Sequence, residues 1–600
     1  MKNAPPSLLK NSLLLGWMLL GLSLLGIGLY TFLTPYEEFT TTLLQAVHKL
    51  DWRAYFQQAV FPLEQYQWLP YMLGVALLGW LTLSPWFFQK VDFWSSSIQL
   101  FLKESGQQQV EFWQQRNASE WLFLGLIIGG AFIRMLYYLG HYALQYDEAW
   151  TYNHFISNGV LVSAISPNNN HIFYTLWACL TNLLPLSGQY SLRIPVVVGG
   201  LLLLLAFYKL ARESGGKNWA LLGLSCLAFA PAASLYSLYA RGYIFQMLFT
   251  VLALGASWKI VDNQKKVAYH WSWWSIAHIL GLYSVPTHAY VWGLMSGFLL
   301  WKSKGKRSFL KAWLKANMVV LAGTVLLYAP YFLTNGGAIL WAAASQSPSG
   351  EALWAYQDKV ADWLLWGGGR GTPVYGIWLG LIGLLFFSRI VFGRVVLQYS
   401  PTKYSPTLVE LTLLFLLFPT FLNLLLGSQP PYRVWCFLGP FWGLWWVQVG
   451  QALAPSWKHS KSLLLGILIM IMTYSWRLEQ HYALQWSAQL DWQVKAIAEQ
   501  LLAKDIQQCY LFSNYDKPLL EYYYLHQGKH LQISMAAPNS KDFAPFEQWP
   551  LYEAVLWDKE DRVPSPTEQA WLEQHYPVVI YQDARVQLHL PKPATASPAN

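Results

Sequence analysis

Charged residues are scarce in this 600-residue chain. Asp, Glu, Lys and Arg make up 12% of it, whereas hydrophobic residues make up 54%, and a soluble domain usually carries about 25% charged residues. Runs of about 20 residues with few or no charges recur along the sequence, and each is long enough to cross a bilayer as a helix. The composition therefore excludes a soluble globular protein and predicts an all-α polytopic membrane protein.

Several familiar sequence signals are also absent. The chain has only four cysteines, three of them in apolar segments, which excludes a disulfide framework. There is no Walker motif, no GxGxxG, no Cys/His zinc spacing and no internal repeat. The net charge of +9 does not indicate nucleic-acid binding, because residues 478–600 hold nine Lys and Arg against 15 Asp and Glu, so the positive charge belongs to the membrane part.

The apolar runs predict about thirteen transmembrane helices. The seventh and eighth runs are short and meet at Pro286, so they form either two helices or one broken helix; the Lys and Arg residues on either side of them favour two. The predicted spans are 12–33, 69–89, 121–140, 193–208, 219–238, 242–258, 273–287, 289–301, 317–333, 374–392, 411–427, 434–453 and 461–476.

Loops rich in Lys and Arg predict the orientation, because such loops stay in the cytoplasm. With the basic loops inside, the loop 141–192, the loop 334–373, the turn around Arg433 and everything after residue 477 lie outside. We therefore expect a multi-pass protein of the plasma (inner) membrane.

The chain divides into three predicted parts. Residues 1–119 hold two transmembrane helices with their loops, 120–477 the remaining membrane region, and 478–600 a small extracytoplasmic α/β domain. In the last part, "CYLFSNY" and "YPVVIYQ" are typical of strands. Pro566 falls at the first position of a predicted helix, and Ser565 and Glu568 have the spacing of a capping box at its start.

An acidic pair is the most unusual feature of the outer loop. Asp147 and Glu148 stand in "YDEAWTY", and no Lys or Arg occurs between His141 and Leu192. The simple interpretation is that both carboxylates cap or solvate a helix start. The functional one makes Asp147 a general base and gives Glu148 an orienting or metal-binding role, since neighbours on a helix point about 100° apart.

Three arginines are predicted on the same side of the membrane. Arg241 and Arg433 stand at the outer ends of spans, and Arg134 lies inside the third span. Arginine binds phosphate with a planar fork of donors, and a charge within a span is a candidate functional residue. The alternatives are an end anchor for Arg241 and Arg433, and for Arg134 a side chain that snorkels to the interface.

The rest of the outer loop predicts a pocket at the membrane surface. Residues 171–186 are apolar, but a span there would reverse the charge pattern, so we expect a helix along the interface. Asn168 or Asn170 could cap this helix, and His171 at its start is a candidate for contact with a ligand.

Four segments, "YDEAWTY", "NNNHIFYTL", "SLRIPVVVGGLLLLLAFYKLARESGG" and "LYARGYIFQMLF", together resemble the GT-C glycosyltransferases. The resemblance is to the branch of protein O-mannosyltransferases and lipid A aminoarabinose transferases and covers residues 120–330. It implies that Asp147 is the base or metal-associated acid, and that His171 and Arg241 match family positions. Ile172 and Phe173 replace two prolines of the family pattern, and Gly242-Tyr243 replaces Pro-Asp.

The resemblance implies transfer of a sugar from a polyprenyl-phosphate carrier to a glycan, lipid or protein acceptor outside the membrane. The expected partners are the lipid-linked donor, that acceptor and the bilayer, with no nucleic acid. Asp147 and Glu148 are the catalytic candidates; a divalent cation, if one is used, would bind one of them. The alternatives are a flippase or transporter of lipid-linked saccharides, or a polymerase or ligase of them. The substrate-binding candidates are Arg241, Arg433, His171, Asn170, Tyr243 and Arg134.

Overall fold

The structure is a computed structural model of the chain. It describes residues 8–46, 50, 53–141, 144–165, 170–186, 188–262, 267–335, 353–366, 375–387, 405–426, 429–453, 464–465, 468–469, 471–473, 476, 493–511, 516–535, 552–558, 566–582 and 586–591. Half of the predicted span 461–476 lies outside these residues, as does the candidate cap Asn168.

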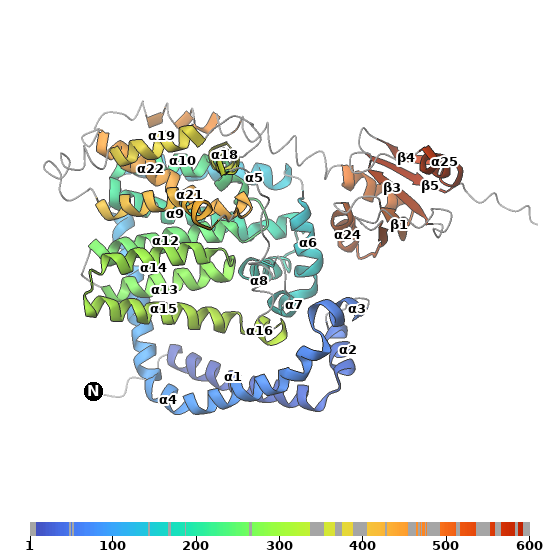
Figure 1. The fold of residues 1–600 in the computed structure, drawn as a ribbon, viewed down its shortest axis with the longest axis horizontal. Helices are drawn as coiled ribbons and strands as arrows, with labels where there is room; N and C mark the ends of the chain where they lie inside the picture. Colours follow the sequence, from blue (N-terminus) through green and yellow to red (C-terminus); the bar gives the residue numbers. More distant parts are fainter. Residues whose placement is uncertain are drawn as a thin grey trace, which may run out of the picture.

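Long apolar helices form one bundle, in which α12, α13, α14 and α15 run side by side (Figure 1). Within the described residues, seven helices are long and apolar enough to cross a membrane. The chain is thus a polytopic helical membrane protein. The seven are α1 (Leu8–Leu33), α4 (Leu63–Gln114), α5 (Ala118–His141), α9 (Gly188–Gly215), α12 (Tyr243–Asp262), α15 (Arg307–Leu327) and α21 (Pro406–Leu426).

Other predicted spans coincide with shorter helices, and proline explains two differences. The span 219–238 is not one helix, because Pro231 has no N–H to donate and restricts the residue before it. It consists of α10 (Lys217–Phe229) and α11 (Pro231–Tyr236). Beyond Pro431, the span 434–453 begins with the 3-10 turn η5 (Tyr432–Leu438) and continues as α22 (Gly439–Leu453).

The two short runs around Pro286 form two helices, as the basic residues predict. They are α13 (Val267–Ser284) and α14 (His288–Lys302). They pack as a hairpin, since a Cβ on Gly281 would lie 2.4 Å from Nε2 of His288. The other short helices of the membrane part are α2 (Tyr36–Ala46), α3 (Arg53–Tyr55), the π-helix η2 (Phe56–Val60), α16 (Ala329–Asn335), α18 (Leu353–Trp366) and α19 (Tyr375–Phe387).

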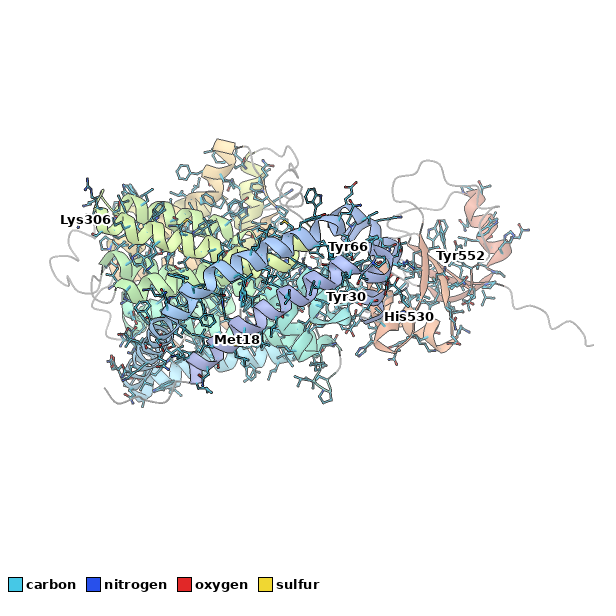
Figure 2. The ribbon with its side chains drawn as sticks, turned by 90° about the horizontal axis from the view of Figure 1, so that it is seen from below. Met18, Tyr30, Tyr66, Lys306, His530 and Tyr552 are labelled. Carbon is cyan, nitrogen blue, oxygen red and sulfur yellow. The ribbon has the colours of Figure 1, made fainter. Side chains whose placement is uncertain are left out.

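The N-terminal helices α1 and α4 pack against each other across one face of the bundle (Figure 2). Helix α4 has 52 residues, about 78 Å at 1.5 Å per residue, so it is far longer than a hydrocarbon core of about 30 Å. Its second half turns and lies across the end of the bundle, where α9 ends and α13 begins (Figure 1). Phe101 of that half packs on Tyr269 and Trp273 of α13.

Close helix packing holds the centre of the bundle together. Helix α10 crosses α22 where Gly223 meets Gly443, and a Cβ on Gly223 would lie 2.7 Å from the Gly443 carbonyl oxygen. Small residues at such crossings are what allow membrane helices to approach each other. Glu120 of α5 accepts hydrogen bonds from Arg116, just after α4, and from Arg212, near the end of α9. It therefore links these three helices.

The C-terminal domain is a five-stranded mixed sheet in the order β2-β1-β3-β5-β4. Strand β1 pairs in parallel with β2 and β3, whereas β5 is antiparallel to β3 and β4. Helix α25 begins at Pro566, as the capping pattern predicts. The elements are β1 (Gln508–Leu511), α24 (Asp516–His526), β2 (Gln532–Met535), β3 (Ala554–Asp558), α25 (Pro566–His575), β4 (Val578–Gln582) and β5 (Val586–Leu590).

Helix α24 attaches this domain to the membrane part. The side-chain amide of Asn153 donates to the Pro518 carbonyl oxygen at 2.8 Å, and the ring of Tyr522 meets that of Tyr152 edge to face. His526 accepts a hydrogen bond from the backbone N–H of Gly188. The domain therefore braces α6 (Tyr146–His154), the helix that carries the acidic pair (Figure 1).

Candidate active site

The acidic pair lies in the first turn of the nine-residue helix α6, beside η3 (Ile156–Asn158), α7 (Gly159–Ile165) and α8 (Ile172–Thr181). Gln145 and Glu148 form a capping box at its start. Carboxylates in a first turn are also favoured by the helix dipole. Because the two acids are neighbours, they point in different directions and meet different surroundings.

Glu148 is buried and fully engaged. It is 1% exposed, and its carboxylate accepts from Nε and Nη2 of Arg193, at 3.1 and 2.7 Å. It also accepts from the backbone N–H groups of Gln145 and Ala240, at 2.9 and 2.7 Å. A buried charge is tolerated when it is paired and hydrogen-bonded in this way. Glu148 therefore ties α6 to α9 and to the turn before α12.

Asp147 has a more open environment. Its side chain is 15% exposed, and Arg433 Nη1 lies 3.8 Å from Oδ2. The same oxygen accepts a hydrogen bond of 2.9 Å from the Tyr239 hydroxyl. Burial raises the pKa of Tyr239 well above its usual value, with the charge of Asp147 adding to the effect, so this phenol remains a donor. Among the described residues, Asp147 Oδ1 has no hydrogen-bond partner, which leaves it available to take a proton.

Arg241 and His171 fix the turn that carries Tyr239. Arg241 is fully buried and donates to the Thr151 hydroxyl at 2.8 Å, on α6. Nδ1 of His171 accepts from the backbone N–H of Gly242 at 2.9 Å, which places the ring proton on Nε2. A Cβ on Gly242 would lie 2.7 Å from that Nδ1 and 2.5 Å from the Ser284 carbonyl oxygen, so this position requires glycine.

Arg433 reaches the site from the other side of the bundle. Its side chain is 49% exposed, and its segment η5 is held rigidly because Trp435 is fully buried and donates to the Tyr356 hydroxyl of α18 at 2.7 Å. The guanidinium group thus stands at the edge of the site, beside Asp147 and open to solvent.

The other candidates have different positions. Tyr243 lies in the site, with its ring against those of His171 and Tyr236. Asn170 does not cap α8; its side chain links α7 to α8, because it donates to the Ser163 carbonyl oxygen and accepts from the Thr175 hydroxyl. Arg134 is buried elsewhere and donates to the Ala228 carbonyl oxygen near the end of α10. The structure therefore does not bring Arg134 to the acidic pair.

Two residues of the site were not among the sequence candidates. Arg193 stands alone in the apolar run "SLRIPVV", and an isolated charge in a predicted span is a signal that could have identified it. Tyr239 gave no such signal, because it is one of 36 tyrosines. Helix α8, at ten residues, is too short to cross a bilayer, in agreement with the predicted interfacial helix.

The acidic pair does not fit a metal ion. The described residues contain no group of three or more His, Cys, Asp or Glu that could hold one. The Glu148 carboxylate is fully used by Arg193 and backbone N–H groups, and Asp147 faces a guanidinium. Divalent Mg²⁺ and Ca²⁺ need several oxygen ligands, which the described residues around Asp147 and Glu148 do not offer.

The structure is thus a polytopic helical bundle with an acidic pair on a short helix between the long ones and a small C-terminal sheet domain, and solved membrane proteins share this fold. One solved structure that the chain resembles in fold is ArnT from Cupriavidus metallidurans. In the apo state the TM-score is 0.53 at 13% identity, over 81% of this chain and 100% of that chain. For ArnT bound to undecaprenyl phosphate the values are 0.51 and 14%, over 80% and 100%.

A more distant likeness is to the oligosaccharyltransferase of Archaeoglobus fulgidus in complex with Zn and sulfate. Its TM-score is 0.42 at 14% identity, over 75% of this chain and 71% of that chain, which is too low to establish a shared fold. No family model and no curated protein matches the sequence. The resemblance inferred from the sequence is therefore confirmed at the level of the fold.

Glu148→Gln should destabilise the protein strongly. The substitution leaves Arg193 buried without a counter-charge, and breaking one partner of a buried pair costs about 3–5 kcal/mol. Thermal unfolding in detergent should show a large fall in Tm for Glu148→Gln and little change for Asp147→Asn, whose carboxylate is partly exposed. Equal Tm values for the two variants would contradict a structural role for the Glu148–Arg193 pair.

Acidification should destabilise the protein through His171. Burial lowers the pKa of His171 well below its usual value, and the charges of Arg241 and Arg433 lower it further. The unfolded chain then binds a proton near pH 6.5 that the folded chain does not, so stability rises with pH. This contribution is complete above about pH 6.5 and is lost as the pH falls below it.

The test compares the fall in Tm between pH 7.5 and 5.5 in the wild type and in His171→Asn, which keeps an acceptor for Gly242 but cannot titrate. The variant should lose less stability. Identical pH profiles would show that the His171 proton is not linked to folding.

Proposed function

We propose that this protein is a membrane glycosyltransferase that moves a sugar from a polyprenyl-phosphate carrier to an acceptor. The observation that carries the proposal is the position of Asp147. Its carboxylate has one oxygen held by Tyr239 and one without a partner among the described residues, and the half-exposed Arg433 lies 3.8 Å away. A base and a phosphate-binding cation thus meet at one opening.

The two residues suit the two halves of a sugar transfer. The acceptor hydroxyl attacks the anomeric carbon while the bond from that carbon to the phosphate oxygen breaks. Asp147 takes the hydroxyl proton, and the carrier leaves as polyprenyl phosphate with the electron pair of the broken bond. Arg433 offsets the negative charge that develops on the phosphate, since a guanidinium binds phosphate oxygens with paired hydrogen bonds.

The remaining residues of the site position these two. Glu148 and Arg193 hold α6, and Arg241 bonds Thr151 one turn beyond Asp147. His171 and Gly242 keep the turn that presents Tyr239. In this proposal Glu148, Arg241 and His171 act through Asp147 and Tyr239 and do not touch the sugar.

The fold supports a lipid-linked donor. ArnT, which this chain resembles in fold, has been solved bound to undecaprenyl phosphate. The loop pattern of Lys and Arg supports a site, and a C-terminal domain, on the extracytoplasmic side of the plasma membrane. Lys306 lies at the end of the bundle away from the C-terminal domain, as that orientation requires (Figure 2). A hexose or pentose, delivered to a glycan, lipid or protein, is the expected cargo.

Asp147→Asn should abolish transfer without unfolding the protein. General-base catalysis contributes about 10²–10⁴-fold to a rate, so release of undecaprenyl phosphate from undecaprenyl phosphate–sugar, with envelope extract as acceptor, should fall at least about 100-fold. Asp505→Asn, at an exposed carboxylate of the C-terminal domain, is the matched control and should retain full activity.

Two outcomes would count against the proposal. Full transfer by a folded Asp147→Asn variant would remove Asp147 as the base. Transport of the lipid-linked sugar across liposomes, with no transfer by the wild type, would favour the flippase alternative.

Arg433→Ala should weaken binding of the carrier lipid. Hydrogen bonds to charged groups contribute about 1.5–3 kcal/mol, so the Kd for undecaprenyl phosphate should rise about 10- to 100-fold, and Arg433→Lys should recover part of the loss. Arg53→Ala, at a half-exposed arginine of α3 that pairs with Glu37, serves as the control. Unchanged binding by Arg433→Ala would show that Arg433 does not hold the phosphate.

A further inference from the structure

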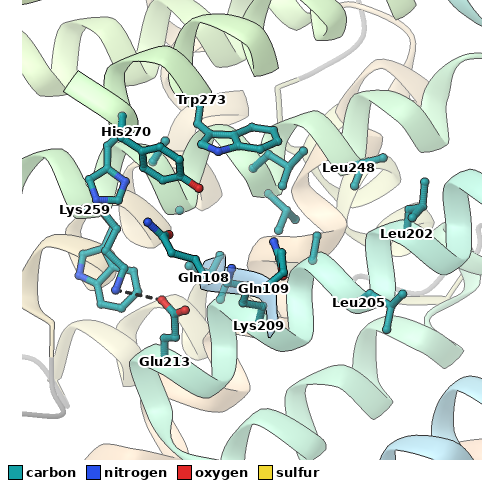
Figure 3. Close-up of a pocket in the computed structure, with 18 of the residues that line it drawn as sticks. Gln108, Gln109, Leu202, Leu205, Lys209, Glu213, Leu248, Lys259, His270 and Trp273 are labelled. Carbon is teal, nitrogen blue, oxygen red and sulfur yellow. Dashed lines mark ion pairs between the residues drawn. The ribbon is translucent and has the colours of Figure 1, made fainter. Parts of the chain in front are cut away.

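A cavity lies at the opposite end of the bundle from the acidic pair. It measures about 490 Å³ and is enclosed by the second half of α4 together with α9, α12 and α13 (Figure 3). Lys209 on its wall follows Arg193 by 16 residues on α9, which is about 24 Å at 1.5 Å per residue. The cavity is therefore separate from the candidate active site.

The walls of this cavity are apolar and its mouth is polar. Leucine and valine side chains of α9 and α12 form one side, among them Leu202, Leu248 and Val251. Gln108, Lys209 and Lys259 gather at the other side (Figure 3). A volume between about 300 and 1,000 Å³ with few polar groups is typical of a ligand site, and this arrangement suits a molecule with an apolar chain and a polar head.

The charges at the mouth favour an anion. Lys259 is paired with Glu213 at 2.9 Å. Lys209 is half-buried and packs over the Phe112 ring at 5.6 Å. The Glu213 carboxylate, which pairs with Lys259, also attracts Lys209, but among the described residues no carboxylate lies within ion-pair distance of Lys209. A lysine on a transmembrane helix is costly without a counter-charge, and basic pockets between membrane helices on the cytoplasmic side bind anionic head groups.

Aromatic residues place the mouth at a membrane surface. Trp113, Trp258 and Tyr269 are among the residues that line the cavity, and such side chains concentrate where the bilayer meets water. The cavity therefore opens at the level of lipid head groups, in the leaflet opposite the candidate active site.

We propose that this cavity binds an anionic phospholipid of that leaflet. The phosphate sits between Lys209 and Lys259, and one acyl chain lies along the leucine and valine wall. The bound lipid then fills the space between α4 and the bundle and gives Lys209 its counter-charge. This proposal is independent of the transfer reaction.

The test measures lipid binding by native mass spectrometry of the delipidated full chain in detergent, titrated with palmitoyl-oleoyl phosphatidylglycerol or phosphatidylcholine. The wild type should prefer phosphatidylglycerol. Lys209→Gln should weaken that binding about fivefold, because one basic residue near a lipid surface contributes about 1 kcal/mol. Lys302→Gln, which removes a lysine already paired with Glu410, is the matched control and should bind as the wild type does.

A second variant tests the cavity without changing charge. Gly255 lines it, and a Cβ there would meet only Leu210, at 3.7 Å, so Gly255→Leu should fill the space and abolish phosphatidylglycerol binding while the Tm is kept. Equal binding of the two lipids, or unchanged binding by Lys209→Gln and Gly255→Leu, would overturn the proposal. Displacement of phosphatidylglycerol by equimolar undecaprenyl phosphate would also overturn it, because the cavity would then belong to the carrier lipid.

Discussion

The buried ion pair between Glu148 and Arg193 is the interaction on which the site depends. Helix α6 has nine residues, and isolated helices of that length are not stable in water. Its place is set by tertiary contacts, and this ion pair is among the most deeply buried of them, with Arg193 at 0% and Glu148 at 1% exposure. Removing water from both groups is costly. The geometry offsets this cost because Glu148 also accepts from two backbone N–H groups, one of them in the turn that presents Tyr239.

Because Glu148 is committed to this ion pair, the two neighbouring acids have different roles. The Glu148 carboxylate accepts hydrogen bonds only from groups that hold the fold, so it is not available to a substrate. Asp147, one position earlier on the same turn, faces an opening that is shared with a half-exposed arginine from a segment almost 300 residues away. The C-terminal domain adds a further contact, since Asn153 on the last turn of α6 donates to Pro518. Contacts from Arg193, from Arg433 and from the C-terminal domain therefore hold α6 and the Asp147 carboxylate in place.

Sequence alone predicted the elements that local patterns determine, and missed those that tertiary contacts determine. The apolar runs predicted a bundle of membrane helices, and Pro566 predicted the first residue of α25. The isolation of Asp147, Glu148 and Arg433 among uncharged residues singled them out. The local sequence could not distinguish the arginines that lie in apolar runs. Arg193 pairs with Glu148, whereas Arg134 donates to a carbonyl oxygen away from the site. Arg241 was expected at the outer surface and is fully buried, because its partner Thr151 comes from another segment that no periodicity reveals.

The distribution of charge along the central helices bears on what the protein does with a lipid-linked substrate. On α9 no charged residue lies between Arg193 and Lys209, and α12 has none from Tyr243 to Trp258. A carrier of charged head groups needs ionisable or unwound segments near the bilayer centre. Here the central turns of these two buried helices offer a phosphate no charged partner, while cations gather at both ends. On these two helices the charges suit a head group that stays at one membrane surface while a bond to it is broken, as the proposed transfer requires.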